Sequence, residues 1–242
     1  MEFDFSLNIG LLVAHLFAYF FILFIFLKIR RKLIDRKLIN SVTSFDRGTN
    51  SERSLILGLL KSAVPADCIF HDLYVRKPNG KYSQIDLVIV TNVGIIVVEI
   101  KDYSGWIFGT SNQTNWTQVL AYGKRKYRFY NPIKQNVNHI DALKQKLKQP
   151  NYIPFFSLIV FYGDCELKKI DYVPRNTYVV SAHRVFDALD IISNENDSIK
   201  YSNEIEMLNI LKQSVNLGEE PEVINKHLND IEDMLGTNRV LK

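Results

Sequence analysis

The sequence contains little glycine, proline or cysteine, which narrows the kind of protein it encodes. Its 242 residues include 11 glycines and 7 prolines, too few for collagen-like or linker-like material. The two cysteines, Cys68 and Cys165, form no CxxC motif and cannot make a zinc site by themselves, so we expect reduced thiols in a cytosolic domain. The net charge is only +4, and 47% of the residues are hydrophobic. The chain can therefore build a core, and its mild basic excess is compatible with a polyanionic partner without requiring one.

A long apolar run lies near the N-terminus. Residues 9–27 carry no formal charge, and about 19 residues at about 1.5 Å each span roughly 28 Å, close to the hydrocarbon thickness of a bilayer. Acidic residues precede the run and basic residues follow it within 28–37, the reverse of a signal peptide. The positive-inside rule then predicts a single-pass protein of the cell membrane with its N-terminus outside and the rest in the cytoplasm. The alternative, a buried core helix, would normally show a polar stripe.

These features divide the chain into successive parts. We expect an extracytoplasmic N-terminus over residues 1–8, a transmembrane helix in the lipid bilayer over 9–27, and a basic juxtamembrane linker over 28–48. An α/β domain over 49–195 and a helical extension over 196–242 follow.

The soluble part alternates between helical and strand-like patterns. Apolar residues recur at helical spacing in 51–62, with Ser51 as the expected N-cap, and in 132–148. Runs rich in Val and Ile predict a hairpin of strands at 82–91 and 94–101. Further strands are expected over 69–75, 155–162 and 178–181, and further helices over 182–192, 204–215 and 221–235. The order predicts an α/β domain built on a mixed β-sheet flanked by helices.

The predicted hairpin places carboxylates and a lysine on one face. If its loop contains two residues, Asp86 lies opposite Glu99 and Gln84 lies opposite Lys101, with all four side chains on the same side. A loop one residue longer would shift this pairing. Two carboxylates at that spacing repel each other and are costly to bury without a compensating cation. Lys101 is one such cation, and Mg2+, which prefers oxygen ligands, is another.

This set of groups suits phosphodiester hydrolysis. A metal polarises the phosphoryl group and lowers the pKa of a water molecule, while a lysine steadies developing negative charge. The alternative is a structural ion pair, which the ExK pattern of Glu99 and Lys101 would favour if it stood alone. Asp86 upstream and the strand setting favour the functional interpretation.

Four segments carry motifs that are specific in combination. They are QID at 84–86, GIIVVEIKDYSGWIFG at 94–109, Trp116 and NPIKQNVNHIDAL at 131–143. Together they resemble the nuclease-related domain, the NERD family, of the PD-(D/E)XK or restriction-endonuclease-like superfamily, over a motif core at 51–147. The resemblance implies a restriction-endonuclease-like fold and a nuclease that depends on Mg2+ or Mn2+. It implies that Asp86 and Glu99 hold the metal, that Lys101 is catalytic, and that Glu52 is a further catalytic carboxylate and metal ligand.

The resemblance also implies supporting positions around the site. These are Gln84, Asn131, Gln135 and His139. Gln135 and His139 lie four residues apart on one helical face and could orient phosphate or water. The alternative interpretation, in which Asn131 caps the helix and His139 is a packing histidine, explains these two residues equally well. Two positions depart from the pattern: Ile85 stands where the superfamily has proline, and Ser51 stands where the family usually has glycine.

A basic and aromatic run precedes the helix expected at 132–148. Cations alternate with aromatic rings there, which suits phosphate contact and base stacking. The candidate nucleic-acid contacts are Lys124, Arg125, Lys126, Tyr127, Arg128 and Lys134. A solvated edge strand protected by lysine explains the run equally well.

The leading hypothesis is a membrane-anchored, cytoplasm-facing, endonuclease-like protein that hydrolyses nucleic acid, with DNA as the expected substrate. The alternative is a non-catalytic module at the membrane that binds nucleic acid or protein on the same scaffold. A third hypothesis is an adaptor that forms a homo-oligomer or binds a protein partner through the helices at 204–235, although amphipathic helices usually pack on their own domain.

Overall fold

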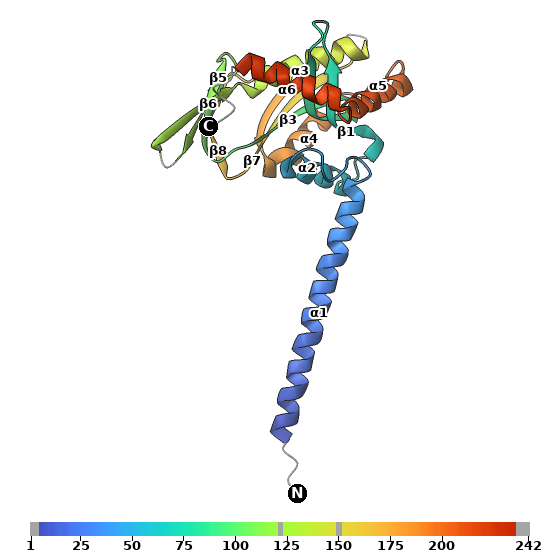
Figure 1. Ribbon diagram of the computed structural model, residues 1–242, viewed down its shortest axis with the longest axis vertical. Helices are drawn as coiled ribbons and strands as arrows, with labels where there is room; N and C mark the ends of the chain where they lie inside the picture. The colour runs from blue at the N-terminus through green and yellow to red at the C-terminus, as the bar shows by residue number, and fades with distance from the viewer. Residues whose placement is uncertain (1–4, 121–122, 149–151, 236–242) are drawn as a thin grey trace.

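A long helix stands away from a mixed α/β domain (Figure 1). The computed structural model describes residues 5–120, 123–148 and 152–235. Helix α1 (Phe5–Ile39) includes the stretch Leu11–Ile39, which reaches a mean hydropathy of 2.3 and buries none of its most apolar part against the protein. By length and composition this helix can cross a membrane.

The last turns of α1 are fixed to the domain. Ile39 is buried, and Asp35 pairs with Lys61 at 2.7 Å. The guanidinium of Arg36 lies 5.3 Å from the centre of the Phe45 ring. The helix therefore continues past the predicted apolar span, and much of the predicted linker over 28–48 is helical.

The domain contains five further helices and nine strands among the described residues, besides short 3-10 turns. The helices are α2 (Asn50–Lys61), α3 (Pro132–Leu147), α4 (Val185–Asn194), α5 (Glu204–Leu217) and α6 (Pro221–Leu235). The strands are β1 (Ile69–Arg76), β2 (Tyr82–Thr91), β3 (Gly94–Asp102), β4 (Gly105–Thr110), β5 (Asn115–Leu120), β6 (Arg125–Tyr130), β7 (Phe155–Tyr162), β8 (Cys165–Asp171) and β9 (Thr177–Ser181).

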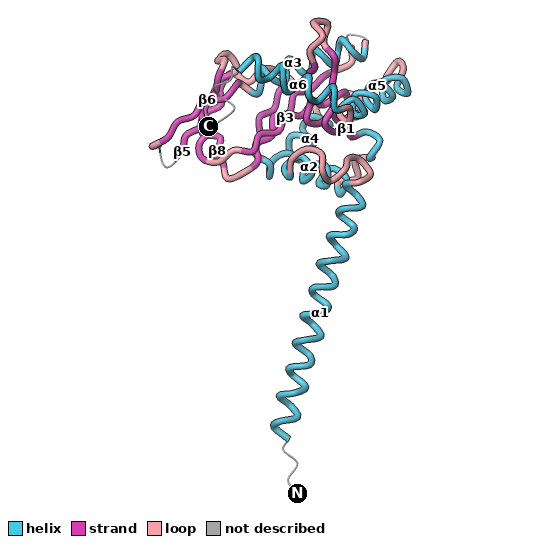
Figure 2. The backbone as a smooth tube through the Cα atoms, viewed as in Figure 1, coloured by secondary structure: helices cyan, strands magenta, loops and turns pink. Residues whose placement is uncertain are grey.

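The strands form two mixed sheets. The larger has the order β1-β2-β3-β7-β9, with β3, β7 and β9 parallel, and the smaller has the order β6-β5-β4-β8. Figure 2 shows β5, β6 and β8 at one side of the domain and β1 at the other. The predicted mixed α/β class is confirmed. The smaller sheet was not predicted, because its strands are short, polar or charged and do not alternate clearly.

Two glycines let the paired strands β3 and β7 pass from the larger sheet into the smaller one. Gly105 begins β4 at φ +79°, and Gly163 precedes β8 at φ +80°. A Cβ atom at either position would lie 2.3 Å from a backbone carbonyl oxygen. Only glycine fits this conformation and this close approach. The parallel pair β3–β7 consequently continues as the parallel pair β4–β8.

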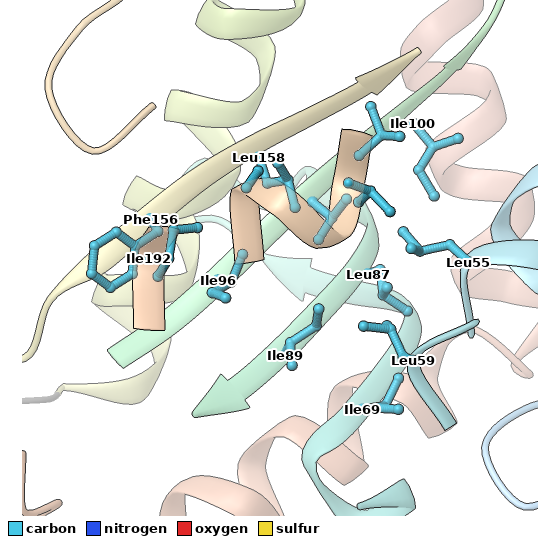
Figure 3. Packing of buried hydrophobic residues seen from close by; sticks show 14 of the residues in the cluster. Leu55, Leu59, Ile69, Leu87, Ile89, Ile96, Ile100, Phe156, Leu158 and Ile192 are labelled. Carbon is cyan, nitrogen blue, oxygen red and sulfur yellow. The ribbon is translucent and has the colours of Figure 1, made fainter. Parts of the chain in front are cut away.

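Helices cover both faces of the larger sheet. Residues of β2 and β3 such as Leu87 and Ile96 pack with Leu55 of α2 and Ile192 of α4 (Figure 3). Alternate residues of the same strands, including Val97, pack on the other face with α3 and α5. Because both faces are buried, these strands are apolar along most of their length, as the sequence predicts.

Helix α2 begins differently from the prediction. Thr49 is its N-cap, and the Thr49 hydroxyl accepts a hydrogen bond from the backbone N–H of Glu52. Ser51, expected as the cap, lies in the first turn and is buried. The prediction was wrong by two residues, because threonine and serine are both favoured caps and both occur here.

Candidate active site on the larger sheet

The hairpin of β2 and β3 has the predicted two-residue loop. Its register runs from the Thr91–Gly94 pair to the Leu87–Val98 pair. The described ladder stops there, one pair short of Asp86 and Glu99. Beyond it, β3 stays paired with β7, whereas the carboxylate of Asp86 accepts the backbone N–H of Ile100 at 2.7 Å. The strands therefore part at the level of the two carboxylates, and an acidic side chain takes the position of a strand partner.

The predicted opposition of Gln84 and Lys101 is absent from this ladder. On the opposite edge of β2, Gln84 pairs with Tyr74 of β1, and its side-chain amide donates to Asp72 at 2.8 Å. The separation of β2 from β3 explains the difference, since a register extrapolates only as far as the strands remain hydrogen-bonded.

Glu99 lies at the centre of a polar cluster on the α3 face of the sheet. Its side chain is 1% exposed, and Oε1 pairs with Nζ of Lys101 at 2.5 Å. Its other oxygen, Oε2, lies 3.2 Å from Nε2 of His139. Nδ1 of that histidine shares a hydrogen bond of 2.7 Å with the hydroxyl of Ser83. Strand β2, strand β3 and helix α3 thus each contribute to the cluster.

Two buried atoms of this cluster have no hydrogen-bond partner among the described residues. They are Oε2 of Glu99 and Nε2 of His139, which approach each other without hydrogen-bond geometry. Buried polar atoms are nearly always paired. A further group beside them, such as an ion, a water molecule or a substrate oxygen, would give both atoms a well-aligned partner.

Burial and mutual repulsion set the charges of the carboxylates. Burial, and then the nearby charge of Glu99, raise the pKa of Asp86 well above its ordinary range. Burial also raises the pKa of Glu99, but His139 and Lys101 outweigh it, and the net pKa of Glu99 is lowered. Burial lowers the pKa of Lys101, but Glu99 outweighs it, and the net pKa is raised. Lys101 is therefore a cation beside an ionised Glu99, and Asp86 favours its neutral form.

The chemistry of this pair fits a divalent cation. Both groups supply oxygen, the donor that Mg2+ and Mn2+ prefer, and Mg2+ commonly binds through one or two carboxylates plus water and phosphate. Oε2 of Glu99 has no well-aligned hydrogen bond within the described part of the chain, and a nearby positive charge would favour ionisation of Asp86. Over the described ranges, no three His, Cys, Asp or Glu side chains form a metal-holding group. Any ion here would rely on the two carboxylates and non-protein ligands.

Glu52, the expected third carboxylate, has other partners. Its Oε2 lies 2.8 Å from Nε2 of His71, and its Oε1 accepts the hydroxyl of Thr49 at 2.8 Å. Nδ1 of His71 in turn shares a hydrogen bond of 2.7 Å with Thr43, which follows α1. Burial raises the pKa of Glu52, but these hydrogen bonds outweigh it and lower the net pKa. Glu52 is therefore an anion in a buried network, and its role as a metal ligand stays a prediction.

Ser51, which replaces the family's usual glycine, forms a contact of its own. Its hydroxyl donates to the carboxylate of Asp102 at 2.5 Å. Asp102 directly follows Lys101 at the end of β3. The substitution thus ties the first turn of α2 to the strand that carries Glu99 and Lys101.

The segment from Asn131 to His139 combines structural and site positions. Asn131 caps α3, and its side-chain oxygen accepts the N–H of Ile133 at 2.9 Å. Its side-chain nitrogen donates to three carbonyls at the end of β4 and in the turn to β5, those of Thr110, Ser111 and Gln113. The capping alternative is therefore confirmed for Asn131. His139 lies beside Glu99, whereas Gln135 is half-buried and makes no side-chain hydrogen bond among the described contacts.

The basic and aromatic run forms the outer edge of the smaller sheet. Residues 124–128 are exposed, with β6 paired on one side only, to β5. Lys134 lies apart from this strand, and its Nζ donates to the carbonyl of Asn112 at 2.9 Å. The placement of β6 fits the alternative interpretation of this run as a solvated edge strand. Contact with nucleic acid stays a prediction.

Sequence reasoning missed three polar residues around the cluster. Ser83 orients His139, and His71 binds Glu52; neither had a signal, because each meets its partner only when separate elements pack together. Asn136 is fully buried, and its amide donates to the carbonyl of Val97 and the hydroxyl of Ser157. Its spacing of three residues from His139 on α3 could have revealed it.

The fold and the cluster define a mixed α/β protein with two carboxylates and a lysine gathered on its larger sheet. Residues 47–162 match the family model of the nuclease-related domain, NERD. This match confirms the resemblance read from the motifs and indicates a nuclease-like scaffold.

One matching relative is an uncharacterized protein of Bacillus anthracis. It is 32% identical over 112 residues, which cover 46% of this chain and 51% of the relative. The chain therefore spans about half the length of the relative it matches. No solved structure matches the chain.

Proposed function

We propose that this protein is a membrane-anchored, cytoplasm-facing nuclease that hydrolyses phosphodiester bonds with the help of Mg2+ or Mn2+. The observation that carries the proposal is the buried Glu99 carboxylate. Its Oε1 pairs with Lys101, and its Oε2 lies 3.2 Å from Nε2 of His139 without a well-aligned hydrogen bond among the described residues. Beside it, Asp86 ionises only at a cost. A stable protein gains little from such an arrangement unless a ligand completes it.

Each residue of the cluster has a chemical task in this proposal. Asp86 and Glu99 would hold the divalent ion, which supplies positive charge to polarise a phosphoryl group. Lys101 is a cation in a mostly buried position, so it can stabilise negative charge that develops on phosphate oxygens. His139, whose Nε2 is unpartnered, can hold or accept a proton from a water molecule near Glu99. Ser83 holds that histidine ring in place.

Hydrolysis by the full-length protein in detergent micelles tests the proposal. We expect Mg2+- or Mn2+-dependent cleavage of DNA or RNA, and a loss of at least about 100-fold in rate for Lys101→Ala. Lys168→Ala, which removes a lysine from β8 of the smaller sheet, is the matched control and should retain full activity. Equal activity of the wild type and Lys101→Ala at matched purity would refute the catalytic assignment.

A second candidate is a non-catalytic module that binds nucleic acid on the same scaffold. It is favoured by the hydrogen bond from Ile100 to Asp86, because a neutral, strand-bridging Asp86 can serve a structural purpose alone. This candidate predicts nucleic-acid binding that survives Asp86→Asn and needs no metal. Binding that depends wholly on Asp86 and on metal would exclude it.

The membrane assignment rests on α1 and the charges beside it. The exposed apolar surface of α1 precedes a cluster of basic residues within 28–37. Such a cluster favours a cytoplasmic location for the chain that follows it. A variant with both native cysteines changed to serine and a single Glu2→Cys reporter tests the topology. We expect an impermeant thiol reagent to label this reporter in intact spheroplasts, whereas a reporter at Arg175 should react only after lysis. The reverse pattern would contradict the proposed orientation.

A further inference from the structure

A cavity of about 710 Å³ lies outside the Asp86–Glu99 cluster. It opens between the turn after β1, the last turn of α3 and the start of α5. Leu147, Met207 and Ile210 give it an apolar floor. The basic residues that line it are Arg76, Lys77, Lys146 and Lys148. The cavity therefore combines an apolar surface with cations from two separate elements of the fold.

The positive charge of this cavity is largely uncompensated. None of its four cations takes part in an ion pair among the residues that the structure describes. Glu206 is the one acidic residue among the described residues that line the cavity, and the side-chain amide of Asn203 already donates to the Glu206 carboxylate. Cations held close together with little opposing charge raise the local concentration of anions.

The cavity lies on the sheet face that carries the cluster. Helix α3 contributes His139 to the cluster and Lys146 to the cavity, and seven residues of helix separate them by roughly 10 Å along the axis. Strand β1 gives a second connection, because Val75 pairs with Ser83 and precedes Arg76. One strand of duplex DNA carries a phosphate about every 3.4 Å along the axis. The distance along α3 thus corresponds to roughly three nucleotides.

The position of the cavity favours a phosphate polymer in solution over the phosphate headgroups of the membrane. In Figure 1, α3 and the turn after β1 lie at the top of the domain, whereas α1 leaves at the bottom beside α2. Phosphate headgroups of the membrane that α1 would cross therefore lie at the opposite side of the domain. A polyanion free in solution can reach the cavity.

We propose that this cavity binds the sugar–phosphate backbone of a nucleic acid, about three nucleotides from the bond placed at the Asp86–Glu99 cluster. This inference rests on the proposed function, because it takes nucleic acid to be the substrate of the Asp86–Glu99 cluster. The cations contact phosphate, and the apolar floor accommodates sugar or base faces. Such contacts position a strand without reading its sequence, and they make affinity steeply dependent on salt.

The test compares two variants with equal changes in net charge. The cavity variant carries Arg76→Gln, Lys77→Gln, Lys146→Gln and Lys148→Gln. The control carries Lys169→Gln, Arg175→Gln, Lys200→Gln and Lys212→Gln, which are exposed and lie outside the cavity. Full-length protein in detergent micelles is titrated into fluorescent 20-nucleotide DNA, single-stranded and duplex, with EDTA to prevent cleavage. Fluorescence anisotropy is measured at several salt concentrations.

We expect the cavity variant to bind DNA at least about tenfold more weakly than the control. For duplex DNA, the slope of log K against log salt should fall in magnitude by about 2 to 3, because each phosphate contact contributes about 0.9 to this slope. The milder pair Lys146→Gln and Lys148→Gln, at the exposed end of α3, should give an intermediate loss. Equal affinity of cavity variant and control, or no DNA binding by the wild type, would overturn the proposal. Cleavage of the same DNA in Mg2+ by the wild type and the two surface variants separates the two claims: weaker binding by the cavity variant without any cleavage by the wild type supports the cavity and refutes the nuclease.

Discussion

The backbone N–H of Ile100 donates a hydrogen bond of 2.7 Å to the carboxylate of Asp86, where the described β2–β3 ladder has ended. This contact gives Asp86 a structural position in addition to any role as a ligand. It also holds the carboxyl group beside Glu99, whose charge disfavours ionisation of Asp86. The stability of the fold and the chemistry of the site are consequently linked through one residue.

Asp86→Asn should stabilise the metal-free protein at neutral pH. The pKa of Asp86 is raised in the fold. The contribution of this carboxyl group to the free energy of unfolding is therefore fully present below the ordinary Asp value near 3.8, and it is lost as pH rises through the raised pKa. Each unit of such a shift corresponds to about 1.4 kcal/mol. Asparagine is neutral throughout and retains an oxygen for Ile100. Thermal unfolding in EDTA should show a higher Tm for the variant at pH 8 and similar values near pH 4; a lower Tm at pH 8 would contradict the assigned charge.

Lys101→Met should destabilise the protein strongly. It leaves the carboxylate of Glu99 buried without its cation, and breaking a buried pair in this way costs about 3–5 kcal/mol. Adding Glu99→Gln removes the isolated charge and should recover much of the loss. Thermal unfolding of both single variants and the double variant measures this coupling. Additive effects of the two substitutions would show that the pair does not interact as described.

Ser51→Ala should cost about 1–2 kcal/mol, because the hydroxyl donates to the carboxylate of Asp102. Ser51→Gly, which restores the residue usual in the family, should cost roughly 1 kcal/mol more through its low helix propensity. Equilibrium unfolding of the two variants separates the lost hydrogen bond from the backbone effect. If glycine proves as stable as serine here, the contact between α2 and β3 contributes nothing measurable.

Gly48→Ala should disrupt the network around Glu52. Gly48 has φ +66°, and a Cβ atom there would lie 2.3 Å from Oε2 of Glu52 and 2.5 Å from Nε2 of His71. We expect a loss of about 2 kcal/mol or more. Gly123→Ala is the matched control, since its φ is +97° but no atom of the described residues is recorded within 4 Å of an added Cβ. It should lose only about 1 kcal/mol from backbone strain. Similar Tm changes for both variants would mean that Gly48 is required for its backbone alone.

The sequence predicts local features of this protein better than long-range ones. Alternation and turn length predict the β2–β3 hairpin and the apolar character of both its faces, because these depend on neighbouring residues. The parting of β2 from β3 at Asp86 comes shortly before β3 and β7 continue as β4 and β8 of the smaller sheet, and no local pattern encodes this arrangement. The same is true of His71, which meets Glu52 only after β1 packs beside α2. Asp86, Glu99 and Lys101 were found because their chemistry is unusual in an apolar hairpin.

Titration of Mn2+ into the full-length protein in detergent micelles tests the central claim most directly. Isothermal titration calorimetry should show binding to the wild type that is lost, or weakened by at least about tenfold, in both Asp86→Asn and Glu99→Gln, with Asp171→Asn as a surface control that binds normally. Unchanged Mn2+ affinity in both site variants would contradict a metal site formed by these two carboxylates.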